Sequence, residues 1–71
     1  MSVAKVIEIS SESESSFEDA INQGIARAAA TLENVSGAWI KEQNVRIQDG
    51  EIVSYRVNMM ITFVLDGGMD D

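Results

Sequence analysis

The residues that could carry chemistry in this chain suit binding better than catalysis. Neither histidine nor cysteine occurs, so the usual general bases and thiol nucleophiles of enzymes are missing. The serines have no base placed beside them by a catalytic motif, and no phosphate-binding loop, dinucleotide fingerprint or EF-hand loop is present. The composition therefore argues against an enzyme, and it offers no Cys/His cluster for a metal.

Three side chains offer recognition chemistry. Trp39, the only tryptophan, presents a flat π face on which a planar ring can stack. Arg56 brings a planar guanidinium that stacks or donates hydrogen bonds, and Gln43 brings an amide. A second interpretation is that Trp39 fills a subunit interface and Arg56 pairs with an acidic neighbour, because interfaces are rich in both residue types.

The first half of the chain predicts a strand and a helix. Residues 3–9 are rich in β-branched side chains, which favours a first strand, and residues 10–16 form a polar, serine-rich stretch typical of a loop. Ser15 and Glu18 have the spacing of a capping box at a helix start. Apolar residues then recur every three or four positions, which predicts a helix over about 16–32.

The second half predicts a long β-hairpin. The pattern changes to period two after the helix, and the Asp49-Gly50 pair is a strong signal for a two-residue turn. A further extended run follows over 51–65. The expected architecture is α+β with the order βαββ, in a single domain over 1–71 whose residues 66–71 form a flexible acidic tail.

The two-residue turn fixes the register of the hairpin: Gln48 pairs with Glu51, and all further partners have residue numbers that sum to 99. In this register one face carries most of the candidate binding residues: Gly37, Trp39, Gln43, Arg56 and Met60. Trp39 then faces Met60, and Gln43 faces Arg56. The more apolar face is predicted to lie under the helix. It carries Glu42, as a buried acid or at a solvent-accessible edge or pore, together with the apolar residues Ala38, Ile40, Val57, Met59 and Ile61.

Length and geometry predict assembly. A chain of 71 residues without disulfides makes a marginal monomer, and its single helix can cover one sheet face only. Strands of about 12 to 15 residues reach about 40 to 50 Å, whereas a helix of about 17 residues covers about 25 Å. Part of the hairpin should therefore project and be covered by other subunits.

The charge and the absence of export signals narrow the partners. With 12 acidic and 5 basic residues the net charge is −7, which disfavours nucleic acid and anionic membranes and favours solubility over an acidic recognition surface. The first residues do not resemble a signal peptide, and no apolar run reaches membrane-spanning length. We expect a cytoplasmic protein.

The chain resembles the dodecin family. The resemblance is carried by KVIEI at 5–9, SFEDAI at 16–21, GIARAA at 24–29, SYRV at 54–57 and FVL at 63–65. It implies a three-stranded antiparallel sheet partly wrapped around one helix, assembled as a hollow homododecamer. It also implies a protein that stores and photoprotects flavin (riboflavin, FMN or lumichrome), bound as stacked pairs between subunits.

The resemblance assigns roles to site residues. Trp39 becomes the stacking platform, Arg56 and Gln43 polar contacts, and Gly37, Met60 and Glu42 neighbours of the ring. In flavin-binding dodecins the tryptophan usually stands at the position of Gly37 and a glutamine at that of Arg56. A shift of two residues keeps Trp39 on the same strand face, about 7 Å further along.

A second branch of the family gives the alternative function. The Tyr55-Arg56 pair and the Glu42-Gln43 pair also resemble calcium dodecin, which lacks the tryptophan. On this interpretation the protein is a non-flavin assembly that binds divalent cations or other ions on its symmetry axes, or a structural shell.

Overall fold

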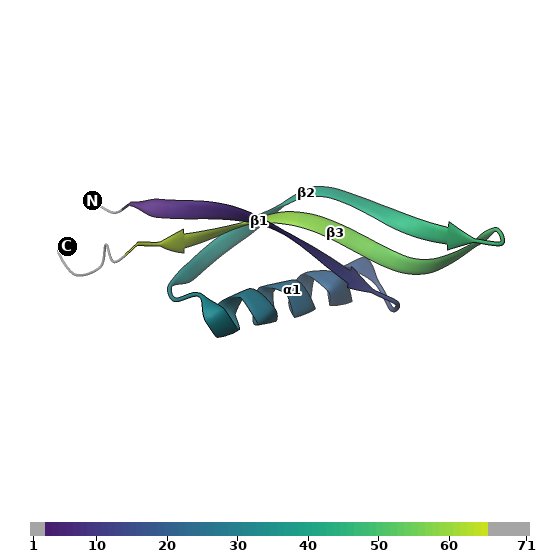
Figure 1. Cartoon of the computed structure of the whole chain (residues 1–71), viewed down its shortest axis with the longest axis horizontal. Coiled ribbons are helices and arrows are strands. Elements are labelled where there is room, and N and C mark those ends of the chain that lie inside the picture. The colour runs from purple at the N-terminus through teal and green to yellow at the C-terminus, as the bar shows by residue number, and fades with distance from the viewer. Residues whose placement is uncertain (1–2, 66–71) are drawn as a thin grey trace.

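The computed structural model describes residues 3–65 and has the predicted βαββ order (Figure 1). Its elements are β1 (Ala4–Ser13), α1 (Phe17–Thr31), β2 (Val35–Gln48) and β3 (Glu51–Val64). The tail predicted at 66–71 lies outside the described residues. No helix within 3–65 is long and apolar enough to cross a membrane.

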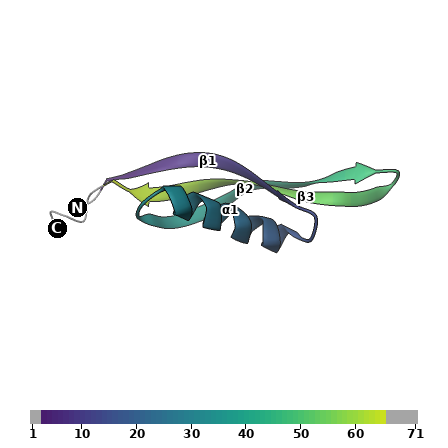
Figure 2. The same ribbon diagram turned by 60° about the horizontal axis from the view of Figure 1, so that its bottom comes forward.

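The three strands form one antiparallel sheet in the order β1-β3-β2, with β3 in the centre. The helix lies along one face of this sheet (Figure 2), and the described chain measures 55 × 19 × 14 Å. The β2–β3 hairpin runs well past the start of α1 (Figure 1). The prediction that the hairpin outreaches its helix is confirmed.

The helix start differs by one residue from the prediction. Ser16, not Ser15, is the N-cap, and its Oγ accepts a hydrogen bond from the Asp19 backbone N–H at 2.9 Å. The backbone N–H of Ser15 instead donates to Ser13 Oγ at 2.9 Å. Glu18 and Asp19 place negative charge in the first turn, where the helix dipole favours it.

The first strand is longer than predicted, because residues 10–13 belong to β1 and not to a loop. These polar residues pair with β3, and the hydroxyl groups of Ser11 and Ser13 form hydrogen bonds with the helix. Ser11 Oγ donates to the Ala20 carbonyl oxygen at 2.7 Å, and buried Ser13 donates to Asp19 Oδ2 at 2.6 Å. Strand pairing thus overrides the weak β propensity of serine.

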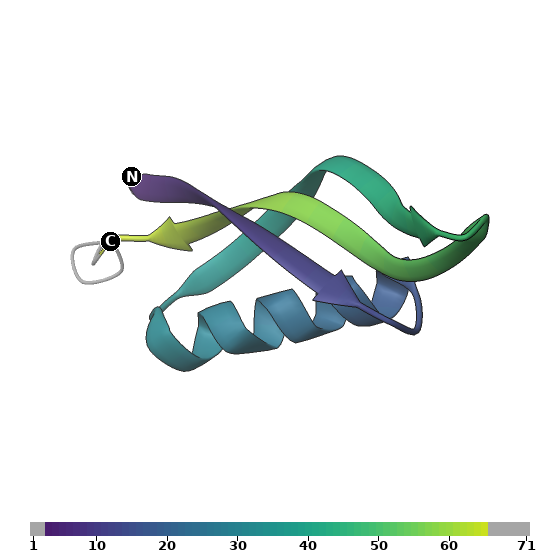
Figure 3. The same ribbon diagram turned by 45° about the vertical axis from the view of Figure 1, so that its right-hand side comes forward.

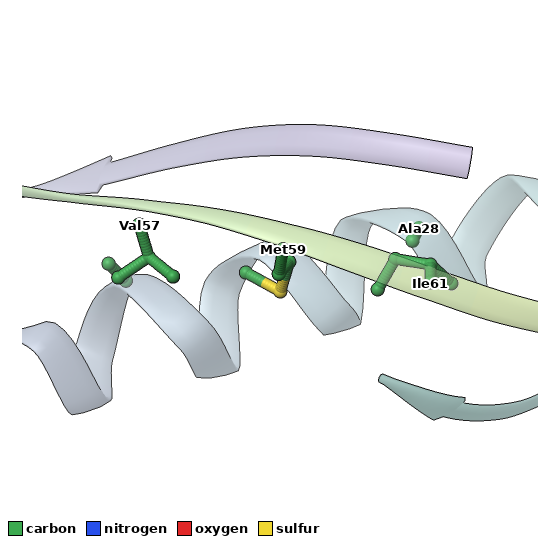
Figure 4. Close-up of a cluster of buried hydrophobic side chains, with 5 residues drawn as sticks. Ala28, Val57, Met59 and Ile61 are labelled. Atoms are coloured by element: carbon green, nitrogen blue, oxygen red, sulfur yellow. The ribbon is translucent and has the colours of Figure 1, made fainter. Parts of the chain in front are cut away.

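The core lies between α1 and the central strand. Val57, Met59 and Ile61 are fully buried and point toward small residues of the helix, among them Ala28 (Figure 4). Gly24 permits this approach, since a Cβ there would lie 2.8 Å from Met59 Cε. The apolar face of β3 was therefore predicted correctly.

The edge strand β2 is less covered than predicted. Ala38 and Ile40 were expected under the helix stripe, yet both are exposed. The reason is the position of the helix: β1 and β2 are both edge strands, but α1 packs mainly over β1 and β3 and makes few contacts with β2. The hairpin turn itself is as predicted, because Asp49 (φ 55°) and Gly50 (φ 80°) are both left-handed, as a type I′ turn requires.

Candidate functional site

The sheet face turned away from α1 carries the candidate site, and we call it the open face. In chain order its main residues are Glu8, Glu12, Gly37, Trp39, Glu42, Arg56, Asn58 and Met60. Trp39 pairs directly with Met60, as predicted, and Gly37 pairs with Thr62. The indole is 53% exposed, so it stands on this face with much of its surface free.

Bulges change the predicted register in the middle of the hairpin. Pairing shifts between Ile40 and Glu42 and shifts back between Arg46 and Ile47, which leaves Lys41 of β2 and Val53 of β3 as the extra residues. A single extra residue reverses which face the following side chains point to. Between the two bulges every pairing is therefore offset by one residue.

This offset corrects two of the predicted positions. Gln43 pairs with Val57 and so lies on the helix side of the sheet, whereas the predicted partner Arg56 pairs with Asn44. Glu42 pairs with Asn58, which places its exposed side chain on the open face and not under the helix. The structure thus brings Trp39, Met60, Gly37, Arg56 and Glu42 to one face and separates Gln43 from them.

Beside the Trp39–Met60 pair, an ion pair joins β1 to the bulge residue of β2. Lys41 Nζ lies 3.2 Å from Glu8 Oε1, and Asn58 Nδ2 donates to Glu8 Oε2 at 3.4 Å. The hydrogen bond from Lys41 is the main cause that lowers the pKa of Glu8, followed by that from Asn58. Glu8 is therefore ionised at neutral pH and is a weak base.

Toward the hairpin tip a second network surrounds Glu12. The buried Ser54 hydroxyl donates to Glu12 Oε2 at 2.6 Å, and Arg56 Nη2 lies 3.3 Å from Oε1. Arg46 Nη1 lies 3.6 Å from Oε2. The Ser54 bond, then that from Arg56, lowers the pKa of Glu12. Arg56 thus pairs with an acidic neighbour, while its exposed guanidinium keeps further donors available.

Sequence reasoning missed the β1 contribution to this face. Glu8 and Glu12 are four residues apart on one strand, so they point to the same side. The first strand was predicted to end at residue 9, so Glu12 was assigned to a loop and was not among the candidate site residues. Among residues 3–65 no group of three or more acidic side chains comes together as a metal site.

Comparisons with known proteins agree on one family. The family model described as Dodecin matches residues 3–66. The calcium dodecin of Mycobacterium tuberculosis (strain ATCC 25618 / H37Rv) is 30% identical over 63 residues, which is 89% of each chain.

Solved structures give the same answer. The dodecin from Streptomyces davaonensis superimposes with a TM-score of 0.87 at 32% identity, covering 92% of this chain and 96% of that one. A tryptophan-to-phenylalanine mutant of the Thermus thermophilus dodecin has a TM-score of 0.86 at 31% identity, covering 92% and 97%. The chain therefore belongs to the dodecin family, whose members are small binding proteins.

Proposed function

We propose that this protein binds a flavin ring against the open face, between subunits of a homododecamer, and that it stores and photoprotects the flavin without converting it. The observation that carries the proposal is the exposed indole of Trp39 on a sheet face that the chain's own helix does not cover. A tryptophan offers a large apolar surface that gains free energy when a planar ring covers it.

The surroundings of Trp39 suit a planar guest. Met60, directly across the hairpin, is half-buried and extends the apolar surface with a polarizable thioether. At Gly37 an added Cβ would meet nothing within 4 Å, so there is open space beside Trp39 on the same face. A ring can therefore lie displaced toward Trp39 from the place it takes in dodecins with a tryptophan at the Gly37 position.

The ionisable groups nearby favour storage over turnover. Glu8 and Glu12 both have a lowered pKa, so they stay ionised and accept protons poorly at neutral pH. Each is held in place by cross-strand partners. These charged side chains beside the apolar Trp39–Met60 pair can orient a ligand, but they supply no general base.

Assembly follows from what the single chain leaves uncovered. Trp39 and the hairpin tip both expose apolar side chains, and the family resemblance implies a dodecamer in which flavins lie between subunits. A ring stacked on one open face is fully covered only when a second copy closes over it. Binding and assembly are therefore coupled in this proposal.

A titration with riboflavin tests the proposal. We expect flavin fluorescence and Trp39 emission to fall together, with saturation at a fixed ratio of flavin to chain, in a sample whose mass by light scattering is that of an oligomer. A monomeric protein, or riboflavin that keeps its fluorescence at any protein concentration, would contradict it.

A second candidate function is the binding of divalent cations. It is supported by the similarity to a relative named calcium dodecin and by the exposed Glu42 carboxylate beside Asn58 on the open face. Because residues 3–65 of one chain bring no three acidic groups together, such a site would combine carboxylates from several copies. A calorimetric response to calcium that Glu42→Gln abolishes, without any response to riboflavin, would favour it over flavin.

A further inference from the structure

The two adjacent methionines of the central strand lie in opposite environments. Residues that follow one another in a strand point to opposite faces of the sheet. Met59 points toward α1 and is fully buried (Figure 4). Met60 is half-buried and lies on the open face, and the helix covers the other side of the sheet only (Figure 3). One thioether is thus enclosed by the core, and the other borders the proposed flavin site.

Met60 lies between an aromatic and a charged neighbour. It pairs with Trp39 on one side and with Glu8 of β1 on the other. The Glu8 carboxylate and the Lys41 ammonium, 3.2 Å apart, belong to exposed side chains. Hydrated charges therefore border the Met60 side chain, so small polar solutes reach it with the water of the ligand-free open face. Met59 is 0% exposed and has no such access.

We propose that Met60 is a redox-sensitive modification site, at which oxidation to methionine sulfoxide by hydrogen peroxide releases the bound flavin. A lone pair of the thioether sulfur attacks one peroxide oxygen, so that an S–O bond forms and the O–O bond breaks. The sulfur loses two electrons, and the second peroxide oxygen takes them, gains the proton of the first and leaves as water. The product is a polar side chain in place of an apolar one, and methionine sulfoxide reductases reverse the change.

Release follows from the place of Met60 beside the stacking residue. The Trp39–Met60 pair supplies apolar surface for the ring to cover, whereas a sulfoxide oxygen covered by the ring loses the water that hydrogen bonds to it. We expect the Kd for riboflavin to rise by about tenfold, which corresponds to about 1.4 kcal/mol. This release rests on the proposed function, but the selective oxidation of Met60 depends on its exposure alone.

Mass spectrometry after a timed exposure to hydrogen peroxide in the dark tests the site. Trypsin cleaves after Arg56, so one peptide carries both Met59 and Met60, and fragmentation between them locates the added oxygen. We expect Met60 to be oxidised at least about tenfold faster than Met59, because oxidation follows exposure. Saturating riboflavin should slow the oxidation of Met60. Equal rates at the two methionines would overturn the proposal.

A riboflavin titration before and after oxidation measures the release. The Kd of the parent should rise about tenfold and return after treatment with reductases for both sulfoxide epimers, while the mass of the oligomer stays constant. Met60→Leu removes the sulfur, so its Kd should be the same before and after peroxide, whatever the starting value. Met59→Leu is the matched control and should respond as the parent does. A loss of affinity that persists in Met60→Leu, or that comes with dissociation of the oligomer, would overturn the proposal.

Failure of this release and failure of flavin binding give different results. A parent that does not quench riboflavin before oxidation overturns the proposed function and the release together. A parent that binds riboflavin and keeps its Kd once Met60 is a sulfoxide overturns the release alone. Met60→Gln places a polar side chain at the same position without any oxidant and should bind riboflavin more weakly than Met60→Leu; equal Kd values for these two variants would contradict the proposal.

Discussion

Replacing Trp39 by alanine removes the largest apolar surface that the open face offers to a ring. A tryptophan buries roughly 200 Å² when fully covered, and Trp39 is 53% exposed in the chain, so a stacked ring newly covers about 100 Å² of it. At about 25 cal/mol per Å² this contact contributes about 2.5 kcal/mol. Since about 1.4 kcal/mol corresponds to a tenfold change, the Kd for riboflavin should rise by about 60-fold.

The assay is a riboflavin fluorescence titration at one salt concentration, with the mass of the oligomer measured on the same sample. Trp39→Phe keeps an aromatic face and should retain most of the affinity. Ile40→Ala is the matched control, because Ile40 is the next residue, 40% exposed, and points to the opposite face of the strand. Parent-like affinity in Trp39→Ala, or an equal loss in Ile40→Ala, would refute stacking at Trp39.

Three further predictions concern the elements that hold the open face in place. Gly24→Ala should lower the urea midpoint, because the added methyl group would lie 2.8 Å from the buried Met59 Cε and 3.0 Å from Ser11 Cβ. Ser11 belongs to the paired strand β1 and cannot swing aside as a methionine end can, so the crowding should cost about 1 to 3 kcal/mol, more than the helix propensity of up to about 1 kcal/mol that alanine adds; a higher midpoint would contradict this packing. Ser16→Ala should cost about 1 kcal/mol by the same measurement, since it removes the N-cap acceptor, and Ser15→Ala should cost less. The hydrogen bond from Ser54, then that from Arg56, lowers the pKa of Glu12 in the folded chain, so the stabilisation by this carboxylate is present above the ordinary pKa of a glutamate and is lost as the pH falls through the folded value. The difference in melting temperature between the parent and Glu12→Gln should therefore close in acid, and a constant difference would be evidence against the network.

Much of the fold could be predicted because several local signals agreed. The Asp49-Gly50 pair demands left-handed φ angles, which few other residues adopt, and both residues have them. Alternation along β3 placed Val57, Met59 and Ile61 on the buried face, and all three are fully buried. Each of these features depends on a short stretch of sequence, so no long-range information was needed.

The bulge at Lys41 could not be predicted, because the sequence around it carries no local signal that fixes the register. The four residues from Lys41 to Asn44 are all polar, so the run contains no alternation of apolar and polar side chains and specifies neither register. The consequence falls on the candidate site: Glu42 and Gln43 exchange faces, and the pairing of Gln43 with Arg56 is wrong. The extent of β1 was missed similarly, because its last serines are stabilised by hydrogen bonds to the helix that only the folded chain provides.

The open face can meet its own copy across a twofold axis, because such an axis brings the same patch of two chains together. On the proposed function this contact places one Trp39 side chain on each side of the ligand. Ligand binding would then need only a pair of chains, and the larger assembly would bring several such pairs together.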